Sequence, residues 1–454
     1  MTKRLMNKET IKDIGVNVCR FVVALTFVFS GYVKAVDPIG TQYKLNDYLA
    51  AVNLEGAVPD YLTLSASVLL AAVELSLGIL LLFAIRRRLV SKLILAFMTV
   101  MTAITVWIAI ADPVKDCGCF GDALKLTNGE TLLKNIVLLA ASIVVCKWPC
   151  AMVRFIGKAN QWIAINYTIL YSIATSTYCL YALPVFDFRP YHIGADIRKG
   201  MEIPPGAEQP QFETTFILKK NGQTKEFTLE NYPDSTWTFV DSKTVQTSEG
   251  YVPPIHDFSM EDMTAGDDMT DDVISSKGYT FLLVSPHLEN ANDSYFGNMN
   301  QLYDYAQAHK YRFYCLTASN AKAIDRWRDM TGAEYPFLFT DETTLKTIVR
   351  SNPGLLLLKD GVVIGKWSHN QLPQLDDESA PLDKLPEGKL SVTSLGKKIC
   401  LSLLWFFLPL FILSLADRTW AWTRRFRKQK SATGQTDGSD STDKDNNTPV
   451  ADEG

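Results

Sequence analysis

Long apolar blocks alternate with short polar loops over the first 185 residues, and one more apolar block stands near the end of the chain. A membrane-spanning helix needs roughly 20 mostly apolar residues. Six stretches have that character: 14–36, 62–85, 89–111, 130–147, 162–184 and 399–416. Between the last two lie about two hundred residues of ordinary globular composition. The pattern predicts a membrane α-helical protein with six transmembrane helices and one large soluble segment.

Basic residues indicate how these helices are oriented. They gather before the first helix, after the second and fourth, and after the sixth, at Lys3, Arg4, Lys8, Lys12, Arg86-Arg87-Arg88, Lys92, Lys147, Arg154, Lys158, Arg418, Arg424, Arg425, Arg427, Lys428 and Lys430. Loops rich in Lys and Arg stay on the cytoplasmic side. We therefore expect a multi-pass protein of the bacterial cytoplasmic (inner) membrane, surrounded by lipid, with both termini cytoplasmic and residues 185–398 extracytoplasmic.

The soluble segment begins with β-structure and continues with alternating elements. Phe212–Lys219 and Thr224–Leu229 flank Asn221-Gly222, which predicts a hairpin, and Thr236–Asp241 a third strand. Residues 257–273 are acidic and are expected to be irregular. Strands are then predicted at Tyr279–Ser285, Tyr311–Thr317, Pro336–Phe339, Leu355–Leu358 and Val362–Trp367, and helices at Asn298–His309, Ala321–Thr331 and Leu345–Arg350. This alternation predicts an α/β sheet with crossover connections.

This order resembles the thioredoxin-like fold, especially its thiol-peroxidase and TlpA-like branch. The resemblance rests on Tyr335-Pro336-Phe337-Leu338 and Asn352-Pro353-Gly354-Leu355-Leu356. It implies a cis proline at Pro353, with Asn352 and Pro353 in a partner-binding groove. The place of that family's Cys-x-x-Cys reads Ser285-Pro286-His287-Leu288-Glu289-Asn290, and the domain's one cysteine, Cys315, lies inside an apolar strand. We therefore expect that this domain does not run dithiol chemistry alone and that it binds a partner or supports the membrane part.

These boundaries divide the chain into six regions. They are a four-helix membrane domain (1–150), a fifth transmembrane helix (151–186), an extracytoplasmic β-rich linker region (187–277), the thioredoxin-like domain (278–372), a linker with the sixth transmembrane helix (373–416), and a basic, then disordered cytoplasmic tail (417–454). The end of the tail is rich in Ser, Thr, Asp, Asn and Gly and has too little apolar surface to fold.

The loop between the third and fourth predicted helices carries Asp116-Cys117-Gly118-Cys119-Phe120-Gly121-Asp122. On the outer side of a bacterial membrane, disulfides persist. Two cysteines separated by one glycine can close only a small, strained ring, and strained exposed disulfides are the exchangeable ones. Lys115 would favour the thiolate, whereas Asp116 and Asp122 would oppose it. Cys117 and Cys119 are thus a candidate thiol–disulfide exchange pair; the alternatives are a structural loop or two free thiols without a role.

Charged residues also occur inside the predicted helices. Glu74 lies near the middle of the second helix, where a charge costs on the order of 3 kcal/mol, so it should face the bundle interior. It is a candidate proton group, or a neutral carboxyl that joins two helices. Arg20 and Lys34 lie near the ends of the first helix, where their side chains can snorkel to the interface. We assign these two residues and Asp122 supporting roles, and we predict no metal site.

Residues 10–148 resemble the DoxX and MauE group of four-helix membrane proteins. The shared features are Arg20, Ser30-Gly31 and Lys34 in the first helix, Glu74 in the second, and Cys117-Gly118-Cys119-Phe120-Gly121, which is similar to the MauE motif. The resemblance implies redox-associated membrane work. MauE-type proteins are linked to the maturation of a periplasmic enzyme with many disulfides, and DoxX-type proteins to quinone-coupled sulfur oxidation.

Two hypotheses of function follow. The first is thiol–disulfide exchange or maturation of extracytoplasmic protein clients through Cys117 and Cys119, linked to a membrane quinone, with Glu74 as the proton group. The second is a non-enzymatic assembly or binding protein whose thioredoxin-like domain docks a partner. A small-molecule transporter is disfavoured, since paired mid-membrane charges and repeats are not evident. The net charge of −4 and the lack of a basic motif argue against nucleic acid as a partner.

Overall fold

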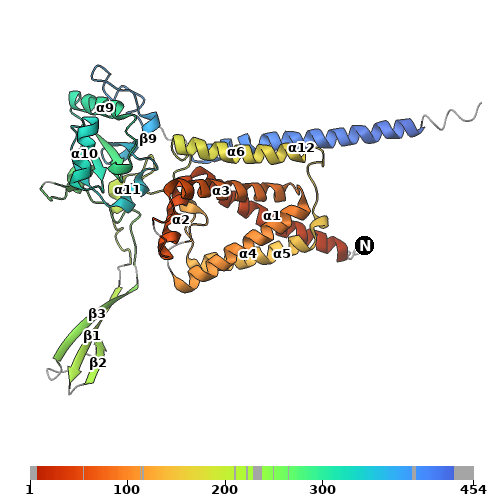
Figure 1. The fold of residues 1–454 in the computed structure, drawn as a ribbon, viewed down its shortest axis with the longest axis horizontal. Coiled ribbons are helices and arrows are strands. Elements are labelled where there is room, and N and C mark those ends of the chain that lie inside the picture. The colour runs from red at the N-terminus through yellow and green to blue at the C-terminus, as the bar shows by residue number, and fades with distance from the viewer. Residues whose placement is uncertain are drawn as a thin grey trace, which may run out of the picture. The chain divides into compact units, whose positions relative to one another are not determined.

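The computed structural model describes residues 8–54, 56–112, 114, 117–208, 211–220, 223–228, 238–248, 250–263, 265–390 and 395–433. The chain divides into two compact units (Figure 1). We call residues 1–179 and 394–454 the membrane unit, and residues 180–393 the sheet unit. Each unit is described by itself.

Four long helices form the bundle of the membrane unit: α1 (Lys8–Val36), α3 (Asp60–Leu82), α4 (Arg87–Ala111) and α5 (Asn128–Lys147). They match the first four predicted spans. A further helix, α12 (Leu395–Thr433), contains the predicted sixth span. These five helices are long and apolar enough to cross a membrane, so a multi-pass membrane unit is confirmed.

The predicted fifth span forms a helix, α6 (Gln161–Tyr181), but it is not among the five helices apolar enough to qualify by composition. Five of the six predicted spans therefore qualify, and a membrane crossing by α6 stays a prediction. The lower hydropathy of α6 comes from a row of small polar residues. Thr168, Ser172 and Ser176 recur every four residues on one helix face and are fully buried. Packing against neighbouring helices, and not contact with lipid, explains their polarity.

Three helical elements of the membrane unit were not predicted: α2, η1 and η2. Helix α2 (Pro38–Ala51) begins with an N-cap, because the Asp37 carboxylate accepts a hydrogen bond from the amide of Gly40 at 2.9 Å. At 14 residues, or roughly 21 Å, it is too short to span a bilayer. A short 3₁₀ helix, η1 (Gly121–Ala123), follows the cysteines, and a second, η2 (Pro149–Ala151), follows α5.

The sheet unit is built on a mixed six-stranded sheet of order β4-β7-β6-β5-β8-β9. Its strands are β4 (Glu261–Asp262), β5 (Tyr279–Ser285), β6 (Arg312–Thr317), β7 (Phe337–Phe339), β8 (Gly354–Lys359) and β9 (Val362–Ser368). The strands β5, β6 and β7 are parallel, and β4, β8 and β9 pair antiparallel. Helices α9 (Phe296–Ala308) and α10 (Ala321–Thr331) provide the crossovers. The predicted α/β sheet is confirmed at this level.

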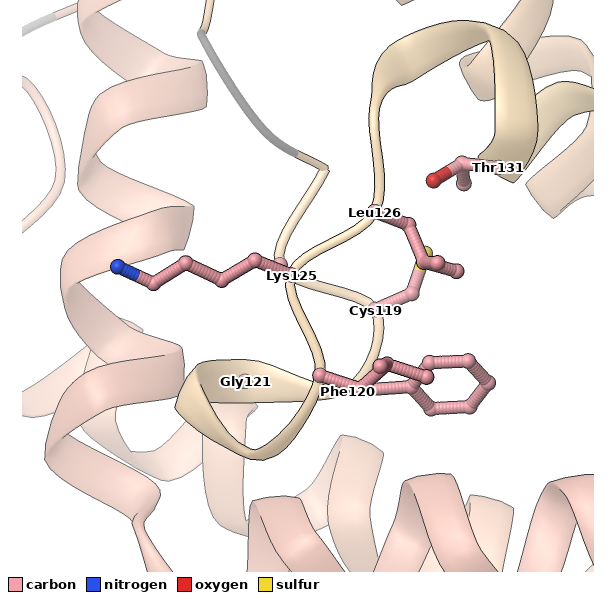
Figure 2. A pocket seen from close by; sticks show the side chains of 8 residues that line it. Cys119, Phe120, Gly121, Lys125, Leu126 and Thr131 are labelled. Carbon is pink, nitrogen blue, oxygen red and sulfur yellow. The ribbon is translucent and has the colours of Figure 1, made fainter. Parts of the chain in front are cut away.

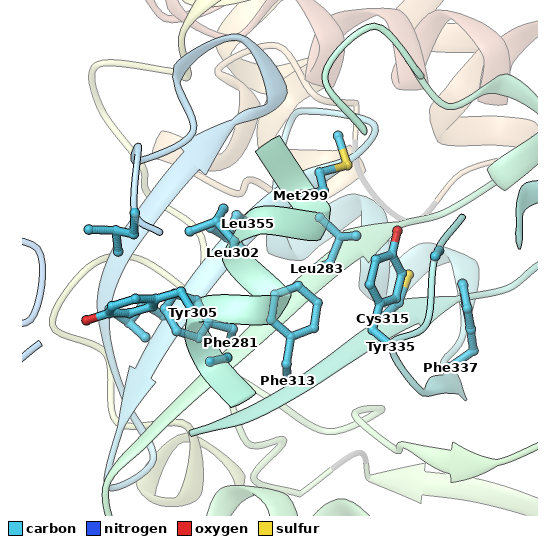
Figure 3. Close-up of a cluster of buried hydrophobic side chains, with 14 of the residues drawn as sticks. Phe281, Leu283, Met299, Leu302, Tyr305, Phe313, Cys315, Tyr335, Phe337 and Leu355 are labelled. Atoms are coloured by element: carbon cyan, nitrogen blue, oxygen red, sulfur yellow. The ribbon is translucent and has the colours of Figure 1, made fainter. Parts of the chain in front are cut away.

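Alternate side chains of β5 enter two different cores, as the two-residue period of a strand requires. Phe281 and Leu283 pack with Met299 of α9 and Trp327 of α10 on one face (Figure 3). The other face packs against α7 (Ile197–Met201), α8 (Thr270–Ile274) and α11 (Glu342–Ile348). Residues 257–273, expected to be irregular, therefore contribute β4 and the start of α8 to the folded unit. Cys315 is fully buried in β6, and this burial raises the pKa of its thiol.

A separate three-stranded antiparallel sheet has the order β2-β1-β3. It consists of β1 (Gln211–Lys220), β2 (Gln223–Thr228) and β3 (Thr238–Ser248). The pairing of Lys220 with Gln223 agrees with the predicted hairpin, although Asn221 and Gly222 lie outside the described residues. The predicted disordered end of the tail, from residue 434, also lies outside them.

Candidate functional site

A close contact between two helices sets the geometry of the candidate site. Gly31 of α1 lies against α3 so closely that a Cβ atom there would overlap the backbone of Leu75. Gly78 of α3 makes a similar contact with the backbone of Val28. Small residues allow membrane helices to approach in this way. The contact brings α1 and α3 together where Lys34 and Glu74 meet.

The Lys34 ammonium is the centre of the hydrogen-bond network. It donates to Glu74 Oε2 at 2.7 Å and to Ser30 Oγ at 2.6 Å. It also donates to the carbonyl oxygen of Cys119 at 2.8 Å. An ammonium has three donors, and all three are used. Lys34 is 6% exposed and Glu74 is 7% exposed, so the expectation that Lys34 snorkels to the interface is wrong. The Glu74 carboxylate provides a counter-charge within the bundle, and the bundle-facing position predicted for it is confirmed.

The backbone on both sides of Gly118 is held to other helices. Ser30 Oγ donates to the Cys119 carbonyl oxygen at 2.7 Å, and Tyr48 Oη of α2 donates to the Cys117 carbonyl oxygen at 2.6 Å. Gly118 has φ +62°, in the left-handed region that glycine adopts without strain. A Cβ atom there would also lie 2.8 Å from Lys44 Cγ. The segment 117–119 is therefore anchored to α1 and α2.

The two sulfur atoms lie 2.8 Å apart, and both cysteines are thiols in this structure. The hydrogen bond from Cys119 is the main cause that lowers the pKa of the Cys117 thiol, to about 6. Burial opposes this shift, while Tyr48 and the charges of Lys134 and Lys34 support it. The same pairing, together with burial, raises the pKa of the Cys119 thiol. The pair is thus electrostatically unequal: Cys117 carries the stabilised thiolate.

Two hollows adjoin the cysteine loop. The loop hollow is lined by Gly118, Cys119, Phe120, Gly121, Leu124, Lys125, Leu126 and Thr131 (Figure 2). The bundle hollow lies among α1, α3, α4 and α5 and is lined by Thr26, Phe27, Ser30, Lys34, Glu74, Phe97, Met98, Met101, Cys119, Phe120, Lys134, Asn135 and Leu138. Cys119 and Phe120 line both.

Lys134 belongs to the candidate site but was not predicted from the sequence. Its ammonium lies 4.2 Å from the centre of the Phe120 ring, and it lines the bundle hollow. It has no carboxylate partner among the residues that the structure describes. It lies one to two turns after the start of α5, and the sequence alone carries no signal that links it to the cysteines. Only the return of the loop across the bundle brings it close to the cysteines.

The other predicted supporting residues are placed differently. Arg20 is fully buried, so its expected snorkelling is wrong. Its guanidinium donates to the carbonyl oxygens of Leu81 and Leu82 at the end of α3, and of Val153. The last carbonyls of a helix lack intrahelical donors and attract a cation. Asp122 lies in η1, beside the cysteine loop. Lys115 and Asp116 lie outside the described residues.

The predicted partner-binding residues lie in the sheet unit. The Asn352-Pro353 bond is cis, and β8 begins at the next residue. Asn352 accepts a hydrogen bond from Ser285 Oγ at 2.7 Å and donates one to the His287 carbonyl oxygen at 2.9 Å. Asn352-Pro353 is therefore joined to the end of β5 where Ser285-Pro286-His287-Leu288 replaces a Cys-x-x-Cys. These residues form a polar site without a thiol.

Residues 12–147 match the family model described as methylamine utilisation protein MauE. Residues 212–249, which cover the three-stranded sheet, match a domain of unknown function, DUF8463. The N-terminal helical region is therefore similar to the MauE family over nearly the whole of the four bundle helices and over the cysteine loop. No curated protein and no solved structure matches the chain. Neither family match reaches residues 278–372, so the thioredoxin-like resemblance stays a prediction.

Proposed function

We propose that this chain is a membrane thiol–disulfide exchange protein that acts through Cys117 and Cys119 on an extracytoplasmic protein client. The observation that carries the proposal is the contact of the two sulfur atoms, 2.8 Å apart, in a loop anchored to buried Lys34. Thiols at this separation need little movement to form a bond. The lowered pKa of Cys117 supplies a thiolate, which is the reactive form in exchange.

Labelling of thiols in intact cells tests this function. A membrane-impermeant maleimide should label Cys117 and Cys119 only after a reductant has been added, because the resting pair is held as a disulfide in an oxidising compartment. The Cys117→Ser and Cys119→Ser variants should each lose exchange with client thiols. If both thiols are labelled without reductant, or if both variants retain exchange, the proposed function is wrong.

Six membrane crossings would give the topology that this function needs, and we propose that α6 is the sixth. It has 21 residues, which gives a length of roughly 31 Å. It packs along α12, with Tyr167 Oη donating to the Trp405 carbonyl oxygen at 2.9 Å and the rings of Tyr171 and Phe406 4.6 Å apart. Its exposed face carries apolar residues suited to lipid: Trp162, Ile163, Ile169, Leu170, Ile173 and Tyr178.

A cysteine placed in the sheet unit can test this topology. Asp377 is exposed, and an Asp377→Cys variant should react with an impermeant maleimide in intact cells. The native Cys150 is exposed and lies after α5, on the side we assign to the cytoplasm. It is the matched control and should be labelled only after the membrane is opened. The reverse pattern would place residues 185–398 in the cytoplasm.

A membrane quinone is the electron acceptor that we propose for the regeneration of the pair. The chemistry of the residues that line the bundle hollow suits such a group, because Phe27, Phe97 and Met98 are apolar and Lys134 is a hydrogen-bond donor in the same hollow as Cys119. A bound quinone would accept two electrons and two protons. Glu74 lines the same hollow and is the acid that we propose takes up a proton when the thiols are oxidised.

The second candidate function is docking of a partner by the sheet unit. We propose that this unit has a thioredoxin-like domain, supported by the parallel β5, β6 and β7, the antiparallel β8 and β9, and the cis Asn352-Pro353 bond. The site around Asn352 would then hold a client without attacking it. A crosslinked partner that persists in the Cys117→Ser/Cys119→Ser variant and is lost in Pro353→Ala favours docking. Loss of the partner in the double serine variant argues against it.

A further inference from the structure

The two cysteines have different access to their surroundings. Cys117 is 7% exposed and lines neither the loop hollow nor the bundle hollow. Cys119 lines both, and it is half-buried (Figure 2). A reactant that enters either hollow therefore meets Cys119. Cys117 instead lies next to Tyr48 of α2, which donates a hydrogen bond to its carbonyl oxygen.

We propose that Cys119 is the sulfur that a client thiolate attacks and that carries the mixed disulfide, while Cys117 is the leaving and resolving thiolate. This inference rests on the proposed exchange function and adds the direction of attack. It also means that Cys119 reacts with both partners. The client reaches Cys119 through the loop hollow, and the electron acceptor reaches it through the bundle hollow.

The oxidation of a client takes place in two successive thiol–disulfide exchange reactions. A client thiolate attacks Cys119 Sγ, a client–Cys119 disulfide forms, and the Cys117–Cys119 bond breaks. The electron pair of that bond goes to Cys117 Sγ, which becomes a thiolate. The second client thiolate then attacks the client sulfur of the mixed disulfide, and Cys119 leaves as a thiolate and takes up a proton. Two client thiols are oxidised to one disulfide, and one loop disulfide is reduced to two thiols.

The electrostatics support this order. In thiol–disulfide exchange, the thiol of lower pKa is the better leaving group. Once Cys119 carries the client it has no S–H group to donate, so the surroundings that still lower the pKa of the Cys117 thiol are Tyr48 and the charges of Lys134 and Lys34. Attack on Cys119 therefore expels a thiolate that Tyr48 stabilises, whereas Tyr48 gives no such support to a Cys119 thiolate.

The anchoring of the loop also favours Cys119 as the fixed partner. Its carbonyl oxygen accepts hydrogen bonds from Ser30 and Lys34, so its backbone is held in place while the client is attached. Cys117 Sγ stays within 2.8 Å of Cys119 Sγ in the reduced pair. A client that lacks a second thiol can therefore be released by return of Cys117 to Cys119.

Mapping of a glutathione adduct tests the assignment without any variant. The purified full-length protein, in detergent with the loop pair oxidised, is mixed briefly with reduced glutathione, quenched in acid, alkylated and fragmented for mass spectrometry. We expect roughly tenfold or more glutathione on Cys119 than on Cys117, with the alkyl group on Cys117. Equal amounts, or an excess on Cys117, overturn the assignment and leave the exchange function standing.

The same experiment separates that result from failure of the function itself. If a mild oxidant never joins Cys117 and Cys119, or if glutathione attacks neither, both the exchange function and this inference are wrong. Single variants give a second measurement, with oxidised glutathione as the reactant because they contain no loop disulfide. In Cys117→Ser the Cys119 thiolate attacks oxidised glutathione, one glutathione leaves as a thiolate, and the adduct on Cys119 should persist for lack of a resolving thiol. A stable adduct that forms instead on Cys117 in Cys119→Ser, with none on Cys119 in Cys117→Ser, reverses the assignment.

Discussion

The Lys34 ammonium lies 2.7 Å from the Glu74 carboxylate and 2.8 Å from the carbonyl oxygen of Cys119. One cation therefore joins an ion pair inside the helical bundle to the loop that carries both candidate reactive thiols. Changes to this ion pair should consequently alter the position of the loop, because the hydrogen bonds of Lys34 go to Ser30, Glu74 and the Cys119 carbonyl oxygen.

Removal of one partner of this pair should destabilise the protein more than removal of both. Glu74→Gln leaves the buried Lys34 charge without its counter-ion, and we expect a loss of about 3 kcal/mol of unfolding free energy. Lys34→Met leaves the opposite charge and should cost a similar amount. The double variant Lys34→Met/Glu74→Leu should recover part of the loss, since no charge remains buried. Thermal unfolding of the purified protein in detergent measures these differences.

A matched control for that series is the exposed pair Arg198 and Glu202, whose side chains are 68% and 64% exposed. Glu202→Gln should leave the melting temperature unchanged, because solvent screens an exposed pair. A double variant at Lys34 and Glu74 that is no more stable than the worse single variant would contradict the role of the ion pair.

Gly31 should be intolerant of even one added carbon. Gly31→Ala places a methyl group into the backbone of α3 at Leu75, so α1 must move away and the contact of Lys34 with Glu74 must lengthen. We expect a lower melting temperature and faster alkylation of the cysteine loop. Gly15→Ala is the control on the same helix, because nothing lies within 4 Å of the added carbon. It should be neutral or slightly stabilising, as replacement of glycine within a helix usually is. If the two variants had the same melting temperature and the same alkylation rate, the close contact at Gly31 would not be needed to position Lys34.

Alkylation of Cys117 in the reduced protein should depend on pH with a midpoint near 6, not near the ordinary thiol value of 9.0. The rate rises with pH, because the thiolate is the nucleophile. Cys119→Ala should move the midpoint upward, since the hydrogen bond from Cys119 is the main cause of the lowered pKa. Lys134→Met should move it upward by less. Mass mapping of the iodoacetamide adduct measures the profile, with the buried Cys315 as the internal control that reacts only after denaturation. A wild-type midpoint near 9 would refute the prediction.

Acid should weaken the sheet unit through Asp187. Burial alone would raise the pKa of this carboxyl, but Lys366 and Arg189, each 2.7 Å away, overcome it and lower the pKa. A carboxyl with a lowered pKa in the folded state stabilises it fully above its ordinary value, and this stability is lost as pH falls through the folded value. Asp187→Asn should cost about 3 kcal/mol at pH 7, because Lys366 stays buried with its charge unpaired.

Limited proteolysis of residues 180–393 during heating measures that effect in the full-length protein. The difference between wild type and Asp187→Asn should be largest near neutral pH and should shrink as the pH falls below about 4. Asp360→Ala is unsuitable as a control, because Asp360 accepts a hydrogen bond from Gly278. Asp377→Asn, at an exposed position, is suitable. A difference that is constant between pH 7 and pH 3 would contradict the titration of Asp187.

Local order along the chain was largely predictable from the sequence. The bounds of β5, at Tyr279 and Ser285, and of α10, at Ala321 and Thr331, were predicted without error. In both cases a regular pattern of apolar residues lies between residues that end a strand or a helix. The local sequence alone therefore determines the element. The position of Glu74 on the inner face of the bundle followed from the cost of a charge in lipid.

The partners of the buried polar groups were decided only by the tertiary structure. A charged side chain near a helix end can either snorkel to the interface or find a counter-charge within the bundle. For Lys34 the close approach of α1 and α3 at Gly31 selected Glu74. Likewise, α6 was expected to be as apolar as the other spans, but one of its faces carries the small polar residues Thr168, Ser172 and Ser176, which are buried inside the membrane unit. The Cys117-Gly118-Cys119 motif was recognisable in the sequence. The inequality of its two thiols was not, because it arises chiefly from the hydrogen bond between them and from Tyr48, which the fold brings from α2 to Cys117.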